Sequence, residues 1–511
     1  MSELEKAYGE LEAIVGKDYI TDKDFMKASY SRNVDPAFPD RWADLIIRPN
    51  NTKEISEIVK LANQYKIKIT PRGGGADLVG GAATNQGILL DLTRMNRIIE
   101  INKDDFYCIV ECGVTWGALI SELYKIGLTT GVLGPGSGYS ATIGGALSNS
   151  TAGFGSTKYG LVPDNCLGVE VVLPNPEGSI IVTGGKSNRF ADPVCRYGVA
   201  PDFTGLFMGD AGILGIKTKA YLKLFPNSPF KIQRNYMLKK DKYEIVSKLM
   251  NAVQTEIREG LHDLYINPKV VVQLLGSQAE EKPEKRLRVS GPVFMFILEA
   301  FDERILDIYK EKLDTIMLKH ARVFEWTEVD LKEKNSEDWV LNLQFPYSYF
   351  NKFISLAPPK ISCTTCHKIP ISKIKEKKLL STQFDRNHQG EFPEDSFSLF
   401  ARSIHLLPNG HCVFAGGFNA ENIDGQRETA MKIWHKKVRA QVRYGGIHYW
   451  LGESISQSIV EADAYSSDFL SFFKNIKRTL DPNFILSPGK FHLYSNKDEM
   501  SNYIIQQDGE V

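Results

Sequence analysis

The chain has 511 residues, of which 42% are hydrophobic and 24% charged, and its formal net charge is zero. This length predicts two domains, and the balanced charge argues against nucleic acid or an anionic membrane as the main partner. No signal peptide or membrane-spanning apolar run is indicated, and seven widely spread cysteines do not predict a disulfide framework. We therefore expect a cytoplasmic globular protein.

Residues 44–225 are predicted to alternate short strands with a few helices. Asn51 is a typical helix N-cap, with Glu54 at the third helical position. The apolar face of this helix comprises Ile55, Ile58, Val59 and Ala62. A second helix is expected at about 116–126. Strands are expected at 45–47, 68–70, 88–92, 98–101, 107–111 and 169–173.

Two glycine-rich stretches, 71–87 and 131–160, interrupt this pattern. Glycine lacks Cβ and is used where other atoms approach the backbone or where φ is positive. Bare N–H groups in such loops bind anions, so the two stretches predict a cradle around a diphosphate. A strand rather than a helix is expected after the first stretch, which excludes a Rossmann fingerprint. No Gly-Lys-Ser/Thr follows, so a Walker loop is excluded as well.

Residues 226–440 differ in character, since charged segments separate apolar strands such as 293–297. The charged segments are interpreted as solvated loops and helix faces, and the region as an α+β second domain. The polar tail beyond Tyr494 is expected to be loosely held.

Four segments carry a family likeness: 71–75 (Pro-Arg-Gly-Gly-Gly); 141–145 with 158–160 and 164–174; 204–207 with 212–216; and 480–483 running to 487–490. Together they resemble the vanillyl-alcohol oxidase and p-cresol methylhydroxylase (PCMH) superfamily, and most of all its D-lactate dehydrogenase and glycolate oxidase FAD-subunit branch. The resemblance implies an α+β, two-domain flavoprotein. It has a PCMH-type FAD-binding domain at 1–225 with its core at 44–225, an α+β cap (substrate) domain at 226–480, and a C-terminal segment at 481–511 that returns to the FAD domain.

The resemblance further implies that both glycine-rich loops enclose the FAD diphosphate. In several relatives a His after the third glycine is bonded covalently to the flavin, but Ala76 stands here. Non-covalent FAD is therefore expected, with a tether from a Tyr or His of the cap left open. The residues expected to bind the cofactor are Pro71, Arg72, Gly73, Gly74, Gly75, Ala76, Asp77, Gly80, Gly81, Pro135, Gly136, Ser140, Ala141, Thr142, Gly144, Gly145, Asn149, Gly153, Tyr159, Gly160, Val169, Val171 and Lys490.

The activity that the resemblance implies is oxidation of a CH–OH group by hydride transfer to FAD. A 2-hydroxy acid such as D-lactate or glycolate is the first expectation for the small-molecule substrate. An aromatic alcohol or alkylphenol is the alternative, because the acid-branch metal pattern is incomplete here. A flavin-bearing subunit of a larger electron-transfer complex is the second alternative. An acceptor protein, a quinone and a homo-oligomer all stay open as partners.

The acid branch holds a divalent metal with a His-x-Gly-Asp-Gly-Asn-x-His pattern and a later Gly-Glu-His. Here His405 and His411 are six positions apart, the acidic residue is missing, and Ser454 follows Glu453. A hairpin turn is expected between the two histidines. A two-residue loop would place them on opposite faces, and only a three-residue loop would bring them together. A metal site at His405, His411 and Glu453, one functional histidine, and purely structural histidines all stay open.

Further candidates for catalysis lie in the second half of the chain. Cys363, Cys366 and His367 match the c-type haem attachment pattern. The alternatives are a metal site formed by these three residues, or neither group, with His367 still lining the pocket. His448 or Glu453 is a candidate for a position over the flavin, with aromatic packing as the alternative. For a substrate carboxylate the expected clamp is Arg402 or Arg443, since a guanidinium binds carboxylates bidentately; a surface salt bridge is the alternative. The candidate bases are His367, His405, His411 and His448.

Overall fold

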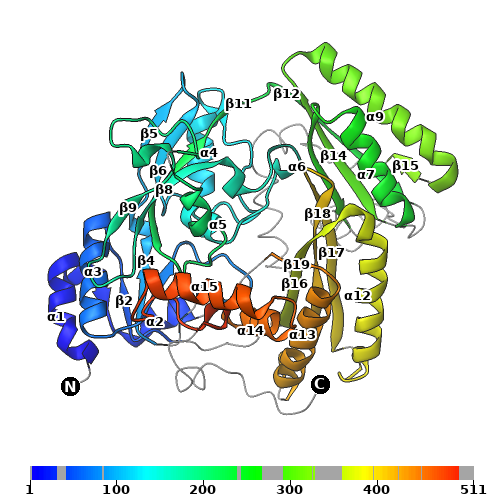
Figure 1. The fold of residues 1–511 in the computed structure, drawn as a ribbon. Coiled ribbons are helices and arrows are strands. Elements are labelled where there is room, and N and C mark those ends of the chain that lie inside the picture. Colours follow the sequence, from blue (N-terminus) through cyan, green and yellow to red (C-terminus); the bar gives the residue numbers. More distant parts are fainter. Residues whose placement is uncertain are drawn as a thin grey trace.

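The computed structural model describes residues 3–31, 42–82, 84, 86–198, 200–238, 243–267, 292–324, 326–328, 360–394, 396–423, 425–449 and 452–493. Figure 1 shows two lobes, with the N-terminal part of the chain in one and a large sheet in the other. Among the helices that the structure describes, none has both the length and the apolar character that crossing a bilayer requires.

The first lobe begins with a four-stranded sheet of order β1-β2-β4-β3. Its strands are β1 (Ile20–Thr21), β2 (Leu45–Ile47), β3 (Ile69–Arg72) and β4 (Ile88–Asp91), and β2, β4 and β3 run parallel. The helices around it are α1 (Glu3–Val15), α2 (Asp24–Ser31) and α3 (Thr52–Gln64). Helix α3 confirms the predicted cap, because the Asn51 side chain accepts a hydrogen bond from the backbone N–H of Glu54. The strand predicted after the first glycine-rich loop is β4.

A second, antiparallel sheet completes this lobe, in the order β5-β6-β10-β8-β9. It contains β5 (Ile98–Asn102), β6 (Tyr107–Glu111), β8 (Cys166–Val172), β9 (Ile180–Val182) and β10 (Ile216–Lys223). Between β6 and β8 the chain forms α4 (Trp116–Tyr124), α5 (Ile143–Ser148) and the single turn α6 (Ser156–Tyr159). The short strands β7 (Leu128–Thr129) and β11 (Phe225–Pro226) pair beside them. The strands predicted at 98–101 and 107–111 and the helix at about 116–126 are thus confirmed.

The second lobe, here called the cap, contains an eight-stranded antiparallel sheet of order β15-β12-β14-β13-β17-β18-β16-β19. Helices α7 (Glu244–Glu256), α9 (Glu303–Phe324), α12 (Ile374–Gln389) and α13 (Gln426–Arg443) pack on the face turned away from the first lobe (Figure 1). The strands are β12 (Phe230–Leu238), β13 (Leu261–Asn267), β14 (Val293–Ala300), β15 (Trp326–Glu328), β16 (Lys360–Pro370), β17 (Phe397–Leu407), β18 (His411–Glu421) and β19 (Ile447–His448).

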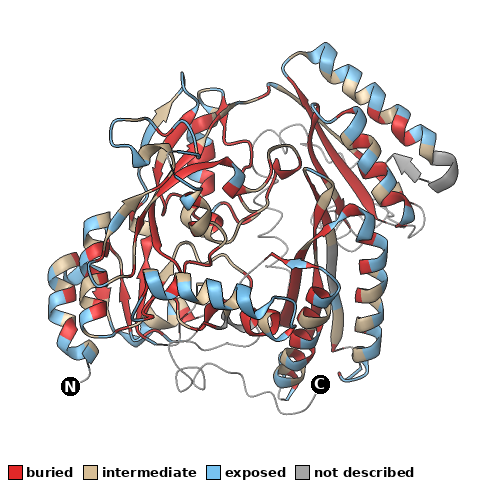
Figure 2. Cartoon of the chain, viewed as in Figure 1, coloured by how far each residue is buried: buried red, intermediate tan, exposed pale blue. Residues whose placement is uncertain are grey.

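Strand β14 shows how the two faces of the cap sheet are used. Phe294 and Phe296 belong to the core under the cap helices, whereas Val293, Met295 and Ile297 belong to the core of the first lobe. Successive side chains of a strand point to opposite faces, so β14 is buried on both sides and reads as a continuous apolar run. Figure 2 shows this burial on the inner strands of both lobes.

The C-terminal part returns to the first lobe through α14 (Glu453–Glu461) and α15 (Ser467–Leu480). Ile485 and Leu486 complete the core around the parallel sheet, and Leu486 bridges Ile69 of β3. The buried ammonium group of Lys477 donates to the carbonyls of Ile213 and Leu486 and to Asp481. The predicted domain limits at 225/226 and 480/481 remain predictions.

Candidate functional site

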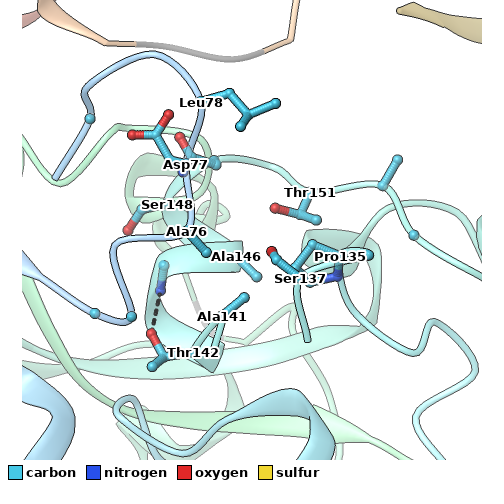
Figure 3. A pocket seen from close by; sticks show the side chains of 18 of the residues that line it. Ala76, Asp77, Leu78, Pro135, Ser137, Ala141, Thr142, Ala146, Ser148 and Thr151 are labelled. Atoms are coloured by element: carbon cyan, nitrogen blue, oxygen red, sulfur yellow. Dashed lines mark hydrogen bonds between the residues drawn. The ribbon is translucent and has the colours of Figure 1, made fainter. Parts of the chain in front are cut away.

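A cavity of about 310 Å³ lies where both glycine-rich loops face the inner side of the cap sheet. Its first-lobe wall comes mainly from the loop after β3, from α5 with the loops around it, and from the start of β10. Figure 3 shows part of this wall with its small side chains. The expected cofactor-binding residues that line the cavity are Pro71, Arg72, Gly73, Gly74, Gly75, Ala76, Asp77, Gly81, Pro135, Gly136, Ala141, Thr142, Gly144, Gly145, Asn149 and Gly153.

The two glycine-rich loops are in direct contact, and this contact requires glycine. A Cβ on Gly74 would lie 1.6 Å from the carbonyl oxygen of Ser140. A Cβ on Gly73 would lie 2.1 Å from Oγ1 of Thr142. Because neither residue has a side chain, the loops close on each other and leave backbone atoms at the cavity surface.

Helix α5 begins at the same wall. The side chain of Thr142 caps it by accepting a hydrogen bond from the N–H of Gly145 at 3.4 Å (Figure 3). The carboxyl of Asp77 also lines the cavity (Figure 3), and burial raises its pKa above the ordinary value. A raised pKa lowers the negative charge that an anionic ligand would meet there.

The remaining expected cofactor-binding residues do not line the cavity. Val169 and Val171 are in the core of the first lobe. Lys490 donates hydrogen bonds to the carbonyls of Gly81 and Ala211, and both of these residues line the cavity. Gly80, Ser140, Tyr159 and Gly160 also lie outside the lining residues.

Sequence reasoning missed part of the wall around the start of β10. Gly212, Gly215 and Ile216 line the cavity, although their segment had been recognised as part of the family likeness. Lys217 lines it too, and its buried ammonium donates to Asp210 Oδ1 at 2.6 Å and Ser148 Oγ at 2.9 Å. Its position two residues after Gly215, at the end of the recognised 212–216 segment, was the signal that could have identified this residue.

The cap forms the opposite end of the cavity with side chains from neighbouring strands. They alternate along each strand, as expected for residues that share one face of a sheet. The cap residues lining the cavity are Tyr265 and Asn267 of β13, Met295 of β14, Cys366 of β16, Ser403 and His405 of β17, Val413 and Ala415 of β18, and Tyr449 after β19.

His405 is the histidine that the structure places at this cavity. Its Nε2 lies 2.7 Å from Oδ1 of the fully buried Asp263. Its ring stacks on Tyr265, with 3.9 Å between the ring centroids and 19° between the ring planes. Burial opposes ionisation of Asp263, but attraction to His405 and hydrogen bonds hold the pKa of this carboxyl below its ordinary value.

The second histidine of the expected metal pattern lies at the end of the same hairpin. Leu407 pairs with His411 and His405 with Val413, so the turn has three residues and both histidines share a face. His411 does not line the cavity, and the side chain of Glu453 lies outside the described residues. Within the described ranges, no group of three or more His, Cys, Asp or Glu side chains is arranged to hold a metal.

The residues of the haem-like pattern are divided between the two faces of β16. Cys366 lines the cavity, whereas Cys363 contacts the carbonyl of Ala430 on α13. His367 pairs with Phe414 of β18, which belongs to the helix-side core, and with His448 of β19. Neither His367 nor His448 is among the residues that line the cavity.

Of the two arginines expected to bind a substrate carboxylate, the structure describes the side chain of one. Arg443 lies at the end of α13, where its Nε donates to the carbonyl of Ala462 rather than facing the cavity. Arg402 belongs to β17, but its side chain lies outside the described residues.

Comparison with known proteins identifies the class of cofactor. Residues 43–184 match the FAD binding domain family. Two solved structures share the fold along nearly the whole chain. They are 4-ethylphenol oxidase from Gulosibacter chungangensis (TM-score 0.80, 16% identity, 97% of this chain and 98% of that one) and p-cresol methylhydroxylase (TM-score 0.78, 17% identity, 96% and 97%). Residues 43–184 therefore form an FAD binding domain, and the chain as a whole has the fold of p-cresol methylhydroxylase.

The chain is also similar in sequence to two curated proteins. The chain is 36% identical over 214 residues to the glycolate oxidase subunit GlcD of Bacillus subtilis, covering 42% of this chain and 43% of that protein. It is 26% identical over 457 residues to the mitochondrial D-lactate dehydrogenase [cytochrome] of Arabidopsis thaliana, covering 88% and 73%. The predicted α+β flavoprotein fold and the predicted FAD cofactor are thus confirmed.

The cavity wall itself fits FAD. A diphosphate needs closely approaching N–H groups, and the first-lobe wall is built from two glycine-rich loops and the start of α5. A Cβ at Gly144 would lie 2.8 Å from Cβ of Cys112, so this position admits only glycine without rearrangement. The cap end carries mainly apolar and aromatic side chains, which suit a flat ring system and its substrate.

Proposed function

We propose that this chain oxidises the CH–OH group of a small 2-hydroxy acid, of the D-lactate or glycolate type. The observation that carries this proposal is the His405 ring, which lines the cap end of the cavity and is held by Asp263. The similarity in sequence to a glycolate oxidase subunit and to D-lactate dehydrogenases supports the substrate class.

The residues of the first-lobe wall hold the cofactor in this proposal. The backbones of 73–75 and 144–145 surround the diphosphate, and Lys490 fixes the first loop through Gly81. When bound, FAD supplies the acceptor for the hydride of the substrate. Ala76 offers no atom for a covalent bond, so we propose non-covalent FAD.

His405 acts as the general base. Its ring accepts the proton from the substrate hydroxyl oxygen, which lets the C–H electron pair leave as hydride. Stacking on Tyr265 fixes the plane of the ring, and the apolar side chains of Met295 and Val413 keep water from the reacting carbon. Arg402 remains our proposed carboxylate clamp, because it belongs to the same strand as His405.

An aromatic alcohol or alkylphenol is the second candidate substrate. The ring centroids of Tyr265 and Phe154 are 4.9 Å apart, and both residues line the cavity together with Tyr449. Such a wall suits an aromatic ring. The third candidate, a flavin-bearing subunit of an electron-transfer complex, differs from both because the isolated chain would not turn over with an artificial dye.

The test is anaerobic bleaching of the bound flavin by a panel of 2-hydroxy acids and para-alkylphenols. We expect bleaching by hydroxy acids, and a loss on the order of 10²–10⁴-fold in the reduction rate for His405→Asn. His411→Asn is the matched control, since His411 belongs to the same hairpin but does not line the cavity. Bleaching by phenols alone would overturn the substrate assignment.

The physiological setting is also proposed. The seven cysteines are free thiols, which fits a reducing compartment such as the cytoplasm. The electron acceptor is proposed to be a protein or a quinone. Comparing turnover of the isolated chain with a dye, with a quinone and with oxygen separates these acceptors, and fractionation of native cells tests the location.

A further inference from the structure

Asp263 is a second buried group of the proposed active site, and its contacts come from both lobes. The residue lies on β13 with no exposed surface. Its Oδ1 lies 2.7 Å from Nε2 of His405 and 2.6 Å from the Thr157 hydroxyl, whose single hydrogen it shares with the Leu406 carbonyl at 2.7 Å. Its Oδ2 accepts from the backbone N–H of Gly155 at 2.8 Å. All these contacts suit an ionised carboxylate, which agrees with the lowered pKa of Asp263.

These contacts determine which nitrogen of His405 carries the hydrogen. An ionised carboxylate can only accept hydrogen bonds, so Nε2 of His405 must donate to Asp263. In the neutral ring the lone pair is then on Nδ1. Nδ1 is then the nitrogen of this ring that is able to accept a proton.

The contacts from the first lobe all come from α6. Gly155 is its N-cap and Thr157 is within it. The same turn carries Lys158 and Tyr159, which bond Glu299 of β14 at 2.8 and 3.1 Å. Helix α6 therefore attaches the cap sheet through two buried carboxylates, Asp263 and Glu299. Asp263 keeps its full set of partners only while the cap is seated on α6.

We propose that Asp263 is the positioning residue of the reaction. It holds His405 in the form protonated at Nε2, and its bonds to Gly155 and Thr157 make this form depend on the docking of the cap onto α6. The inference rests on the proposed role of His405 as the base.

Asp263→Asn tests the tautomer directly. The N–H of Gly155 can only donate, so the amide oxygen of the new side chain takes the place beside Gly155 and its NH₂ group faces His405. An NH₂ group can only donate, so Nε2 must accept and the hydrogen moves to Nδ1. We expect the flavin reduction rate to fall on the order of 10⁴-fold, as for the wrong tautomer in a Ser-His-Asp triad, while KM and FAD content stay unchanged.

The ¹⁵N spectrum of the histidines gives a readout that is independent of activity. The chain has nine histidines, and the spectrum of His405→Asn identifies the signals of His405. We expect Nε2–H in the wild type and Nδ1–H in Asp263→Asn. Nδ1–H in the wild type, or an unchanged tautomer in the variant, would overturn the inference.

Variants of Thr157 keep the test valid even if Asp263→Asn folds poorly. Thr157→Val keeps the shape but removes the hydroxyl, so we expect a loss of about tenfold in the reduction rate, equal to about 1.4 kcal/mol. Thr157→Ser retains the hydroxyl and should keep nearly the wild-type rate. Equal rates for the two variants would contradict the role of the hydroxyl. If His405→Asn itself leaves reduction intact, the proposed function fails; if only His405→Asn slows it, the positioning role alone fails.

Discussion

Replacing Gly145 by alanine should weaken FAD binding without lowering the stability of the apoprotein. A Cβ at this position meets only Thr142 Oγ1 within 4 Å, at an ordinary contact distance of 3.4 Å. The protein without FAD should therefore fold normally. Because Gly145 lines the cavity, the added methyl group occupies space that the cofactor needs.

The size of the effect follows from the cost of overpacking. Inserting a methyl group into a filled site costs about 1–3 kcal/mol, so we expect the affinity for FAD to fall about 5- to 150-fold. Gly74→Ala is the contrasting variant, because its Cβ would lie 1.6 Å from the Ser140 carbonyl oxygen. The two loops would have to separate by more than about 1 Å to reach a normal contact distance. We therefore expect Gly74→Ala to lower the stability of the apoprotein as well.

Two measurements check this prediction. Titration of the apoprotein with FAD gives the dissociation constant, and thermal unfolding without FAD gives the stability of the fold. Unchanged FAD affinity in Gly145→Ala would show that the methyl group does not face the cofactor. Normal apoprotein stability in Gly74→Ala would refute the contact between the two loops.

Three further predictions concern stability and metal content. Burial opposes ionisation of Glu299, but His262, Lys231 and Lys158 lower its pKa from 4.5 to about 2, which contributes about 3 kcal/mol of stability above pH 4.5. This contribution is lost as the pH falls toward 2. The free energy of unfolding in urea should therefore be lower for Glu299→Gln than for the wild type at pH 7, and the difference should be much smaller at pH 3. Lys477→Met leaves Asp481 buried without its cation, and we expect the free energy of unfolding in urea to fall by about 3–5 kcal/mol. Arg478→Met is the control, because Arg478 is exposed. Treatment with a chelator should leave the flavin reduction rate unchanged, since Nε2 of His405 contacts Asp263 and His411 does not line the cavity; stoichiometric metal by elemental analysis of untagged protein would contradict this expectation.

Local sequence patterns predicted most of the first lobe. Strand β6 and the cap of α3 follow from alternation and capping, which involve residues close together in the chain. The two glycine-rich loops, also read from sequence, line the same cavity. Their mutual contact, in which Gly74 abuts Ser140, depends on the packing of two distant segments and is not readable from either one alone.

The histidines show where sequence reasoning stopped. Four of them were candidate bases, and strand register separates two of these. His405 lies on the cavity face of β17, whereas His367 lies on the helix face of β16. A shift of one residue in register reverses the face of every side chain. The three-residue turn before His411 likewise decided that both histidines of the hairpin share a face.

The sequence by itself determined the flavin class of this protein, because glycine positions and short motifs are local properties of the chain. The tertiary structure decided which side chains meet. Asp263 and His405 are 142 positions apart, and Gly155 and Thr157 reach Asp263 from the other lobe. No local pattern encodes these contacts, because they arise only when the cap sheet packs on α6 and buries the carboxylate among its partners.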